Sequence, residues 1–441
     1  METISQKIFL TYDIRGRYPK EINGDVLWRL GYNLPLILQK QKKLPHRRLK
    51  IVVGRDSRPS GAVLIKNLIQ GLLQNNVEVV DAGVITAPML YFLIKKHHFD
   101  LGFIITGSHL SENYTGLKIY TQELNAISGN WLLQFIDILN RPATVGLTKG
   151  KLARKNFLND YSQFLLQKTQ IEKKQKALQQ KNILVCCPKA SQLILEIVRK
   201  ELKLNLQFVH RPIPKRLIRE RKCDFVVQFD SDGDRMYVFN QKGEQILGDV
   251  IGAFFVELMK NKTPKKTIVD YRCGRFLINL ARHYHFRIIY SPAGHGFFKQ
   301  AMRKNKALLG IEKSGHYYWK DFFFADSGIF SFLMLLKFLA SEKENIDELA
   351  RQFVKGVVLP EINFKVKNPN QIGKIFQKIE KIFAKAKINK SDGLTVWSKD
   401  FKFNLRASQT EPGTLRLNIE AINETVLQET LSTIKKIINN Q

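Results

Sequence analysis

Short runs of β-branched and apolar residues alternate with amphipathic stretches along most of this chain, and this alternation limits the fold more than any other feature. Near the start, residues 51–53 predict a strand, residues 62–74 have helical spacing, and residues 77–80 and 101–105 predict further strands. Strand, helix and strand at this pitch predict βαβ units with a parallel sheet. In such sheets the ligand sites lie at the carboxyl ends of the strands, so chemistry is expected in the loops that follow them.

The alternation returns twice before the pattern changes. The later strand candidates are 183–187, 225–229, 267–270, 287–290 and 307–309, and the later helical stretches are 190–202, 274–284 and 296–304. The final part differs, because 357–366, 393–408 and 414–422 predict antiparallel strands, accompanied by helices at 370–386 and 424–438. These last segments predict an α+β unit that closes the protein.

A chain of 441 residues is too long for one hydrophobic core. We therefore predict an α/β protein with three similar mixed α/β domains and a C-terminal α+β domain. The expected bounds are 1–142, 143–244, 245–356 and 357–441.

The composition fits a globular protein of the cytoplasm. Apolar residues make up 44% of the chain, and no run reaches the roughly 18 uninterrupted apolar residues that a membrane span needs. The first residues lack the pattern of a secretory signal, so we expect cytoplasmic localisation and no membrane partner. Cys186, Cys187, Cys223 and Cys273 have no C-x-x-C spacing, and we expect buried, reduced thiols.

The net charge of +32 is the one unusual property of the composition. It is compatible with a nucleic-acid or membrane-surface partner. The basic residues are scattered, however, and none of their clusters interleaves aromatic residues as a base-stacking surface does. We favour solvated lysines spread over the surface, whose positive field attracts anionic ligands, and we do not expect a nucleic-acid partner.

An acidic loop, in FDSDGDRMYVFN at 229–240, follows one of the predicted strands. Asp230, Asp232 and Asp234 occupy every second position after the strand. Alternate side chains of an extended backbone share one face, so these carboxylates can converge on one cation. Hard oxygen ligands favour Mg²⁺, and the neighbouring Arg235 offers a planar guanidinium to a phosphate. The loop therefore predicts a magnesium site.

Other interpretations of this loop stay open. An EF-hand loop also begins with alternating acids, but it needs Gly and Glu where this chain has Arg235 and Gln241. A solvated acidic turn is a second alternative. A third is a phosphatase loop in which Asp230 is the nucleophile.

A second polar segment, ITGSHLSENYTGLK at 105–118, also begins where a strand ends. Ser108 lies beside His109, and Lys118 follows ten positions later. A serine hydroxyl forms a stable phosphoester once it is activated. Lys118 can transfer the proton if desolvation and neighbouring cations lower its pKa. Taken alone, the segment is better explained as an ordinary loop whose hydroxyls bond the backbone.

Two later segments suggest ligand contacts. In IEKSGHYYWKD at 311–321, the alternating Glu312, Ser314 and His316 include a carboxylate and a hydroxyl that can bind vicinal sugar hydroxyls. In LRASQTEPGTLR at 405–416, a pocket for a phosphate that is not transferred is predicted. Its candidate residues are Arg406, Ser408, Gln409 and Thr410. Further guanidinium groups next to predicted strand ends are Arg15, Arg17 and those of the GRDSR turn at 54–58.

In this order and at these intervals, the segments resemble the α-D-phosphohexomutase family over nearly the whole chain. The resemblance rests on YDIRG, T-G-S-H…G-x-K, D-x-D-G-D-R, S-G-H after Glu312, and R-A-S-x-T-E-P. DYRCGR at 270–275 and AGHGFFKQAM at 293–302 are most similar to the bacterial phosphomannomutase/phosphoglucomutase branch.

The resemblance implies domains around a central cleft, and a role for each motif residue. It implies catalytic roles for Ser108, Lys118, His109, Arg15 and His316, and one Mg²⁺ per chain on Ser108, Asp230, Asp232 and Asp234. It implies substrate contacts from Arg235, Arg272, His295, Glu312, Ser314, Arg406, Ser408, Gln409 and Thr410. Arg15 would steady the transferring phosphoryl group, and Glu312 and Ser314 would hold the sugar O3 and O4.

Several positions depart from the family pattern. The usual His-Asn-Pro is His109-Leu110-Ser111, and a later Asn is Thr115. The residues on either side of Glu312 are Ile311 and Lys313, which bears on sugar preference. CCPKASQ at 186–192 replaces a Gly-rich turn, a change for which we have no functional account.

The expected function is that of a phosphoprotein isomerase of carbohydrate metabolism. It would interconvert hexose 6-phosphate and hexose 1-phosphate, with mannose or glucose as the hexose, through phospho-Ser108. Hexose 1,6-bisphosphate would be intermediate and activator, and the protein a monomer or weak dimer. The alternatives are a sugar phosphatase that uses Asp230 and a catalytically decayed, basic binding protein.

Overall fold

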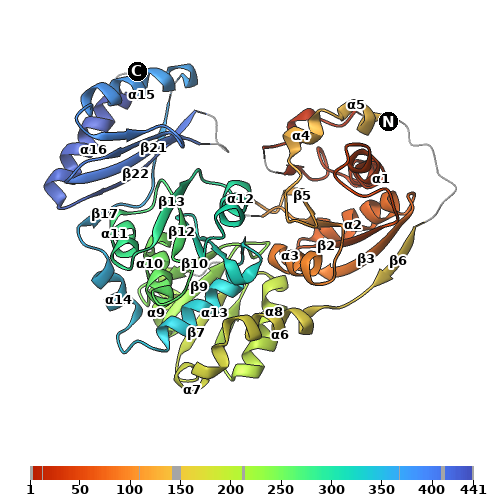
Figure 1. Ribbon diagram of the computed structural model, residues 1–441, viewed down its shortest axis with the longest axis horizontal. Helices are drawn as coiled ribbons and strands as arrows, with labels where there is room; N and C mark the ends of the chain where they lie inside the picture. Colours follow the sequence, from red (N-terminus) through yellow and green to blue (C-terminus); the bar gives the residue numbers. More distant parts are fainter. Residues whose placement is uncertain are drawn as a thin grey trace. The chain divides into compact units, whose positions relative to one another are not determined.

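The computed structural model describes residues 3–11, 13–108, 110–141, 150–210, 214–366, 368–408 and 413–439. It forms two compact units (Figure 1). The first unit comprises Met1–Gly243 and Asp321–Ala340, and the second comprises Glu244–Lys320 and Ser341–Gln441. The chain therefore returns to the first unit for one short segment after it has entered the second.

The first sheet of the first unit is mixed and has the strand order β1-β5-β4-β2-β3-β6. Its strands are β1 (Ile14–Arg17), β2 (Leu49–Arg55), β3 (Val77–Val84), β4 (Leu101–Ile105), β5 (Tyr114–Thr121) and β6 (Lys151–Arg154). The parallel pairs β2–β3 and β2–β4 confirm the predicted βαβ arrangement, and β5 runs antiparallel to β4. Every residue of β4 is buried, which explains its uninterrupted apolar run.

Helices cover this sheet and join it to the next one. They are η1 (Gln6–Ile8), α1 (Gly24–Lys40), α2 (Pro59–Leu72), α3 (Ala87–Lys96), α4 (Gly129–Leu133), α5 (Ile136–Asn140), α6 (Leu158–Thr169), η2 (Ile171–Lys174) and α7 (Gln175–Leu178). Helices α1 and α2 pack against each other, and Leu30, Leu34 and Leu68 enter the same core as Ile51 and Phe103 of the sheet. This core anchors the strand ends from which the loops emerge.

The other sheet of the first unit contains the acidic segment. Its elements are β7 (Asn182–Cys186), α8 (Lys189–Leu202), β8 (Asn205–Val209), α9 (Lys215–Glu220), β9 (Phe225–Phe229) and β10 (Met236–Phe239). Strand β7 is parallel to β8 and β9, whereas β10 is antiparallel to β9. The returning segment contains β16 (Ala325–Asp326), which is not a strand of this sheet, and α13 (Gly328–Leu339). Phe332 of α13 packs edge-on against Phe229.

The second unit also begins with a mixed sheet. The strands that this unit contributes to the sheet are β12 (Lys266–Asp270), β13 (Arg287–Ser291), β14 (Leu309–Glu312) and β15 (His316–Trp319). The other elements along this part of the chain are β11 (Gln245–Ile246), α10 (Gly248–Met259), α11 (Arg275–His283), α12 (His295–Asn305), η3 (Lys320–Phe322) and α14 (Ile346–Phe353). Strand β12 is parallel to β13 and β14, and β15 forms an antiparallel hairpin with β14.

The chain ends in an antiparallel sheet with two helices over one face (Figure 1). The elements are β17 (Val357–Val358), β18 (Ile362–Lys365), η4 (Pro369–Gln371), α15 (Ile372–Ile382), β19 (Lys387–Asn389), β20 (Leu394–Trp397), β21 (Phe401–Ala407), β22 (Thr414–Ala421) and α16 (Glu424–Asn439). Ile375 of α15 and Leu427 of α16 share a core with Phe403 and Leu417 of the sheet. Three mixed sheets and a final antiparallel one confirm the predicted fold class.

Several elements differ from the sequence prediction. The strand predicted at 307–309 is β14, which starts only at Leu309, because the Ala307 N–H bonds the Met302 carbonyl and still belongs to the end of α12. Several helices were not predicted, among them α1, α3, α6, α10, α13 and α14. Helices α10 and α13 are buried on nearly all sides and therefore lack an amphipathic period.

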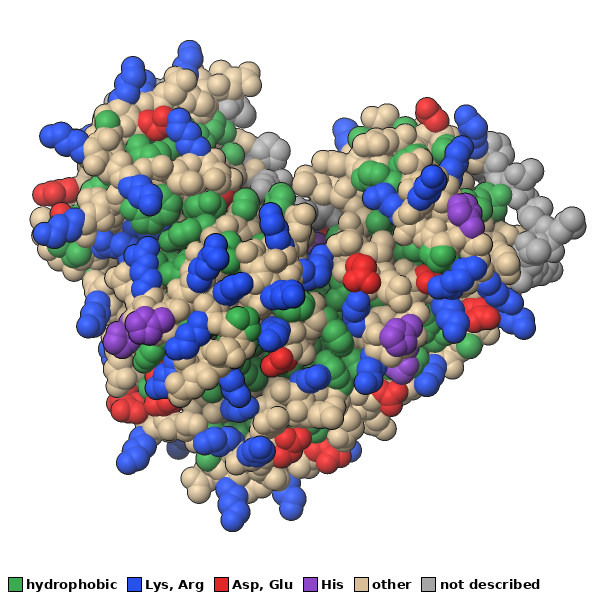
Figure 2. Space-filling view, viewed as in Figure 1, with side chains coloured by type: hydrophobic (Ala, Val, Ile, Leu, Met, Phe, Trp, Pro, Cys, Tyr) green, Lys and Arg blue, Asp and Glu red, His purple; other side chains and the backbone are tan. Residues whose placement is uncertain are grey.

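The domain bounds stay predictions, and the one at 142 lies outside the described residues. Cys186, Cys187, Cys223 and Cys273 are buried and unbridged, as predicted. Of the helices that the structure describes, none is both long and apolar enough to cross a membrane. Figure 2 shows the lysine and arginine side chains dispersed over the visible surface, with acidic side chains between them.

Candidate active site

The segment that carries Ser108 turns sharply at the carboxyl end of β4. Ser108 has a left-handed backbone with φ 48°, and its N–H donates to Thr106 Oγ1 at 2.8 Å. Its side chain is almost fully buried, with 3% exposure. A non-glycine residue in this conformation is strained unless its surroundings hold it there.

Arg58, at the start of α2, holds this turn. Its guanidinium donates to the carbonyl oxygens of Ser108 at 2.7 Å, Leu110 at 2.6 Å and Ser111 at 2.6 Å. It also donates to the Ser231 hydroxyl at 3.2 Å, in the acidic loop after β9. One side chain therefore ties the serine loop to the acidic loop.

The acidic loop brings its carboxylates together as the sequence predicted. Oxygens of Asp230, Asp232 and Asp234 lie within 4.8 Å of one another, and all three residues are buried. Gly233 has φ 71°, and a Cβ there would lie 2.9 Å from Thr86 Cγ2, so this position requires glycine. The Gly328 N–H at the start of α13 bonds the Gly233 carbonyl at 3.1 Å and fixes the loop from another side.

Lys118 of β5 reaches into this cluster. Its Nζ lies 2.5 Å from Asp232 Oδ2 and 2.9 Å from Asp234 Oδ2. Burial opposes the charged form, but Asp232 and Asp234 raise the pKa of Lys118 well above its usual value. A lowered pKa would have required neighbouring cations. The nearest charges are anions instead, so Lys118 is held protonated in this arrangement.

The negative charges of these aspartates are only partly compensated by the cations and donors around them. Burial, followed by the charges of Asp234 and Asp232, raises the pKa of Asp230 well above its usual value. Asp230 Oδ2 and Asp232 Oδ1 are buried without a hydrogen-bond partner among the residues that the structure describes. Buried carboxylate oxygens of this kind are costly unless a cation meets them. The donor set, oxygen only, fits Mg²⁺.

Two arginines flank the serine loop. Arg15 donates to the Gly107 carbonyl at 2.6 Å and is paired with Asp13. Burial opposes its charge, but Asp13, Asp232 and Asp234 together raise the pKa of Arg15. Arg235 donates its N–H to Asp230 Oδ1 at 3.2 Å and its guanidinium to the Tyr237 hydroxyl at 3.2 Å. The first unit thus gathers Ser108, Lys118, Arg15, Arg235 and the three acids around the same pair of loops.

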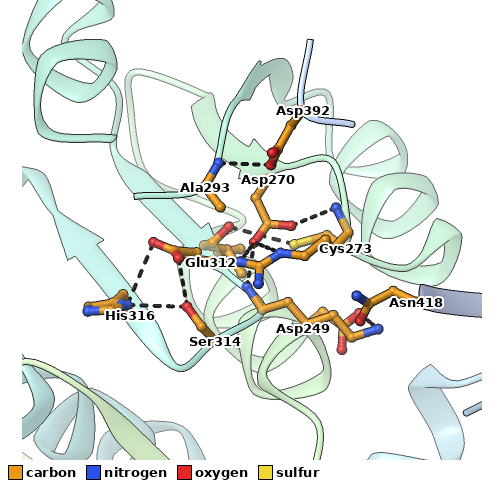
Figure 3. Close-up of polar contacts among 12 residues, drawn as sticks. Asp249, Asp270, Cys273, Ala293, Glu312, Ser314, His316, Asp392 and Asn418 are labelled. Carbon is orange, nitrogen blue, oxygen red and sulfur yellow. Dashed lines mark hydrogen bonds and ion pairs between the residues drawn. The ribbon is translucent and has the colours of Figure 1, made fainter. Parts of the chain in front are cut away.

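In the second unit, the β14–β15 hairpin arranges the predicted sugar-binding residues (Figure 3). Glu312 faces His316 across the hairpin, and Gly315 completes the turn with φ 90°. The Ser314 hydroxyl donates to Glu312 Oε1 at 2.7 Å, and His316 Nδ1 lies 3.6 Å from Glu312 Oε2. The alternation noted in the sequence therefore places all three side chains together.

Arg272 connects this hairpin to the end of β12. It donates to Asp270 Oδ2 at 2.6 Å and to Glu312 Oε1 at 3.3 Å. Burial alone would raise the pKa of both acids. The charge of Arg272 on Asp270, and those of His316 and Arg272 on Glu312, bring each pKa below its usual value. Both carboxylates are therefore held ionised inside the protein.

The predicted phosphate pocket lies on β21. Arg406 is 9% exposed, and its Nη1 lies 4.0 Å from Asp392 Oδ1. Burial, and then the charge of Arg272, lowers the pKa of Arg406, and its Nε has no hydrogen-bond partner among the described residues. Asp392 also accepts the Ala293 N–H at 3.0 Å, which ties the loop before His295 to the C-terminal sheet. A buried guanidinium in this state suits an anionic ligand.

The remaining candidates have less structural support. Ser408 bonds the Thr414 carbonyl through its N–H, and His295 begins α12. Arg17 donates to the Tyr114 hydroxyl at 3.1 Å. His109, Gln409 and Thr410 lie outside the described residues.

Comparison with known proteins identifies the family of this chain. The family description "Phosphoglucomutase/phosphomannomutase, alpha/beta/alpha domain I" matches residues 6–130, and that of domain III matches residues 247–356. The phosphomannomutase/phosphoglucomutase of Pseudomonas syringae pv. tomato is 30% identical over 96% of this chain and 92% of its own length. This chain belongs to the phosphoglucomutase/phosphomannomutase family of α-D-phosphohexomutases.

Other known proteins are similar to this chain over nearly its whole length, in sequence or in fold. The phosphomannomutase of Methanocaldococcus jannaschii is 29% identical over 98% of this chain and 97% of its own length. The crystal structure of a phosphoglucomutase/phosphomannomutase family protein from Burkholderia thailandensis superposes with a TM-score of 0.83, at 23% identity, covering 99% of this chain and 98% of its own. An Aspergillus fumigatus N-acetylphosphoglucosamine mutase, solved with GlcNAc-6P and magnesium, has a TM-score of 0.62 at 11% identity, covering 99% of this chain and 97% of its own.

Sequence reasoning missed several residues that organise this phosphohexomutase site. Arg58 was noted only as one of several guanidinium groups, and its partners are mostly backbone carbonyls, which leave no sequence signal. Asp270 and Tyr318 were not singled out, although both contact the Glu312 cluster. Asp270 ends a strand and is the first residue of DYRCGR, which is the signal that could have identified it.

Proposed function

We propose that this phosphohexomutase interconverts hexose 6-phosphate and hexose 1-phosphate, with mannose or glucose as the hexose. The observation that carries the proposal is the contact of Lys118, from the serine loop's own hairpin, with Asp232 and Asp234 of the acidic loop. A nucleophilic serine, a protonated lysine and a cluster of magnesium-type ligands then belong to one site. Phosphoryl transfer depends mainly on positioning and charge neutralisation, and these groups supply both.

The proposed reaction consists of two transfers. Phospho-Ser108 gives its phosphoryl group to the free 1- or 6-hydroxyl of a hexose monophosphate, and a hexose 1,6-bisphosphate forms. The P–O bond to Ser108 Oγ breaks as the new P–O bond forms, and Oγ takes up a proton. The bisphosphate turns over, and its other phosphoryl group returns to Ser108 Oγ, whose proton passes to the oxygen of the leaving sugar.

Lys118 is placed to give the proton that Ser108 Oγ needs, because Asp232 and Asp234 keep it charged. His109 and His316, which sequence resemblance implicates in proton transfer, remain predictions for the group that takes the sugar's proton. Asp230, Asp232 and Asp234, with an oxygen on Ser108, would hold Mg²⁺. The ion would neutralise charge on the phosphoryl oxygens.

Substrate binding is assigned to the second unit. Glu312 would accept hydrogen bonds from the sugar O3 and O4 hydroxyls, and Ser314 would bond the same hydroxyls. His316 and Arg272 lower the pKa of Glu312, so its carboxylate is ionised for this purpose. Arg406 would bind the phosphate that is not being transferred. Its buried Nε without a partner among the described residues supports this role.

The test is a coupled assay with mannose, glucose and glucosamine 1-phosphates, in Mg²⁺ and a trace of glucose 1,6-bisphosphate. We expect turnover of the mannose or glucose ester, and loss of about three orders of magnitude or more in Ser108→Ala. Circular dichroism checks that the variant is folded. Release of free phosphate without isomerisation would instead support the phosphatase alternative. Near-normal isomerisation by Ser108→Ala would overturn the assigned nucleophile.

A further inference from the structure

The carboxylate of Glu312 is held from several sides within the second unit. Oε1 accepts hydrogen bonds from the Ser314 hydroxyl at 2.7 Å and from Arg272 Nη2 at 3.3 Å. Oε2 accepts a hydrogen bond from the Tyr318 hydroxyl at 3.1 Å. An ionised carboxylate offers about four lone-pair positions, so these donors leave little freedom for the orientation in which it receives a further hydroxyl.

Tyr318 is itself fixed. It is fully buried, and its ring stacks on Phe298 of α12 with centroids 4.9 Å apart and planes 20° apart. On β14, the residue paired with Tyr318 is Gly310, and a Cβ there would lie 2.9 Å from Tyr318 Cβ. The glycine therefore makes room for the tyrosine, and the hydroxyl is already in place before any ligand arrives.

Tyr317 provides an internal comparison. It is the preceding residue on β15, and its ring is equally buried. Its hydroxyl donates to the Gly248 carbonyl at 3.0 Å, at the start of α10. Successive strand residues point to opposite faces of the sheet, so one tyrosine hydroxyl serves Glu312 and the other serves the backbone of a helix.

We propose that Tyr318 is a positioning residue that sets the orientation of Glu312 and thereby the configuration accepted at the sugar O4. This inference rests on the proposed function, in which Glu312 binds O3 and O4. Mannose and glucose share their configuration at C3 and C4 and differ at C2, whereas galactose differs from glucose at C4. A fixed Glu312 therefore favours the first two sugars over galactose and does not distinguish between them.

Tyr318→Phe keeps the ring and removes only the hydroxyl. We expect KM for glucose 1-phosphate and mannose 1-phosphate to rise about tenfold each, with kcat changed less than about threefold, because binding of the sugar is what the hydroxyl supports. The ratio of the two KM values stays constant. Competitive inhibition by galactose 1-phosphate should weaken far less than glucose 1-phosphate binding, so discrimination at C4 falls about tenfold.

Tyr317→Phe is the matched control, since it removes a buried hydroxyl from the neighbouring position of the same strand. We expect its KM values and its C4 discrimination to stay within about twofold of wild type. Thermal unfolding of both variants reports the structural cost separately. If both variants lose discrimination equally, Tyr318 acts only through stability and the inference is wrong.

Glu312→Gln gives a second route that does not depend on how well Tyr318→Phe folds. Adding Tyr318→Phe to Glu312→Gln should change KM by less than about twofold, because the acceptor that Tyr318 orients is already altered. Full, additive effects of the two substitutions would overturn the inference while leaving the proposed function intact. A wild-type protein that neither binds nor isomerises glucose or mannose 1-phosphate would overturn the proposed function itself.

Discussion

Two buried clusters of acids and cations, one in each unit, differ in how completely their charges are satisfied. In the first unit, Asp230 has a raised pKa, and oxygens of Asp230 and Asp232 have no hydrogen-bond partner among the described residues. In the second, Arg272 keeps the pKa of Asp270 lowered, and His316 together with Arg272 keeps that of Glu312 lowered. The first cluster is under-compensated and suited to gain a cation. The second is complete and suited to orient neutral hydroxyls.

The largest expected effect is on catalysis through the first cluster. Asp232 is fully buried and contacts Lys118, so Asp232→Asn removes a proposed metal ligand and the partner of the proposed proton donor. We expect kcat to fall about 10⁴-fold, and Mg²⁺ affinity measured by calorimetry to fall as well.

Asp321→Asn, at an exposed position of the same unit, is the control and should retain full activity. Loss of activity in Asp232→Asn with unchanged Mg²⁺ affinity would show that the acidic loop does not hold the ion.

The next effect is on stability through the second cluster. Arg272→Ala removes the main cation of the buried Asp270 and one of the charged partners of the buried Glu312. We expect a loss of about 3 kcal/mol in the free energy of unfolding by urea, because breaking a buried pair from one side leaves an uncompensated charge. The exposed Arg282→Ala in the same unit should cost less than about 0.5 kcal/mol. Equal costs for the two variants would mean that the cluster is not as tightly coupled as its distances indicate.

Removing a charge from the first cluster should instead raise the free energy of unfolding. Asp230→Asn keeps an oxygen for the Arg235 N–H and relieves the repulsion from Asp232 and Asp234. In the absence of Mg²⁺, we expect the variant to be more stable than wild type by about 1 kcal/mol. Added Mg²⁺ should raise the melting temperature of wild type and leave that of the variant nearly unchanged. If Asp230→Asn were less stable than wild type in the absence of Mg²⁺, the first cluster would not be under-compensated, and the two clusters would not differ in this respect.

The smallest effect is the pH dependence of the second cluster. Glu312 has a lowered pKa in the folded protein, so its ionised form contributes stability at pH values above its unfolded pKa. That stability is lost as the pH falls through the folded pKa. We expect wild type to exceed Glu312→Gln by about 1 kcal/mol at pH 7, and the difference to shrink below about pH 4.5. A difference that grows on acidification would mean that the Glu312 pKa is raised.

For the first cluster, the sequence predicted the acids themselves but not the contacts that hold them in place. Three acids at alternate positions after an apolar strand have a direct geometric meaning, and the structure brings them together. Lys118 was predicted as a proton-transfer group, but its pairing with Asp232 and Asp234 was not. These contacts join segments that lie more than a hundred residues apart in the sequence. Pairing at that distance follows from the packing of two sheets, which no local pattern encodes.

In the second unit, the local sequence pattern predicted the residues of the hairpin turn but not the residue that holds Glu312 in place. Glu312, Ser314 and His316 alternate along a short turn, and their proximity follows from that spacing. Tyr318 continues the same alternation, yet its hydroxyl matters only because Gly310 and Phe298 fix its ring. Its role therefore depends on packing between β14, β15 and α12, which became visible only in three dimensions.

The most direct test of the central claim is the position of the phosphoryl group on the protein. After incubation with glucose 1,6-bisphosphate and Mg²⁺, peptide mapping by mass spectrometry should find phosphate on the peptide containing Ser108, stable to hydroxylamine as a serine ester is. A hydroxylamine-labile phosphate on the peptide containing Asp230, with Ser108 unmodified, would contradict the account.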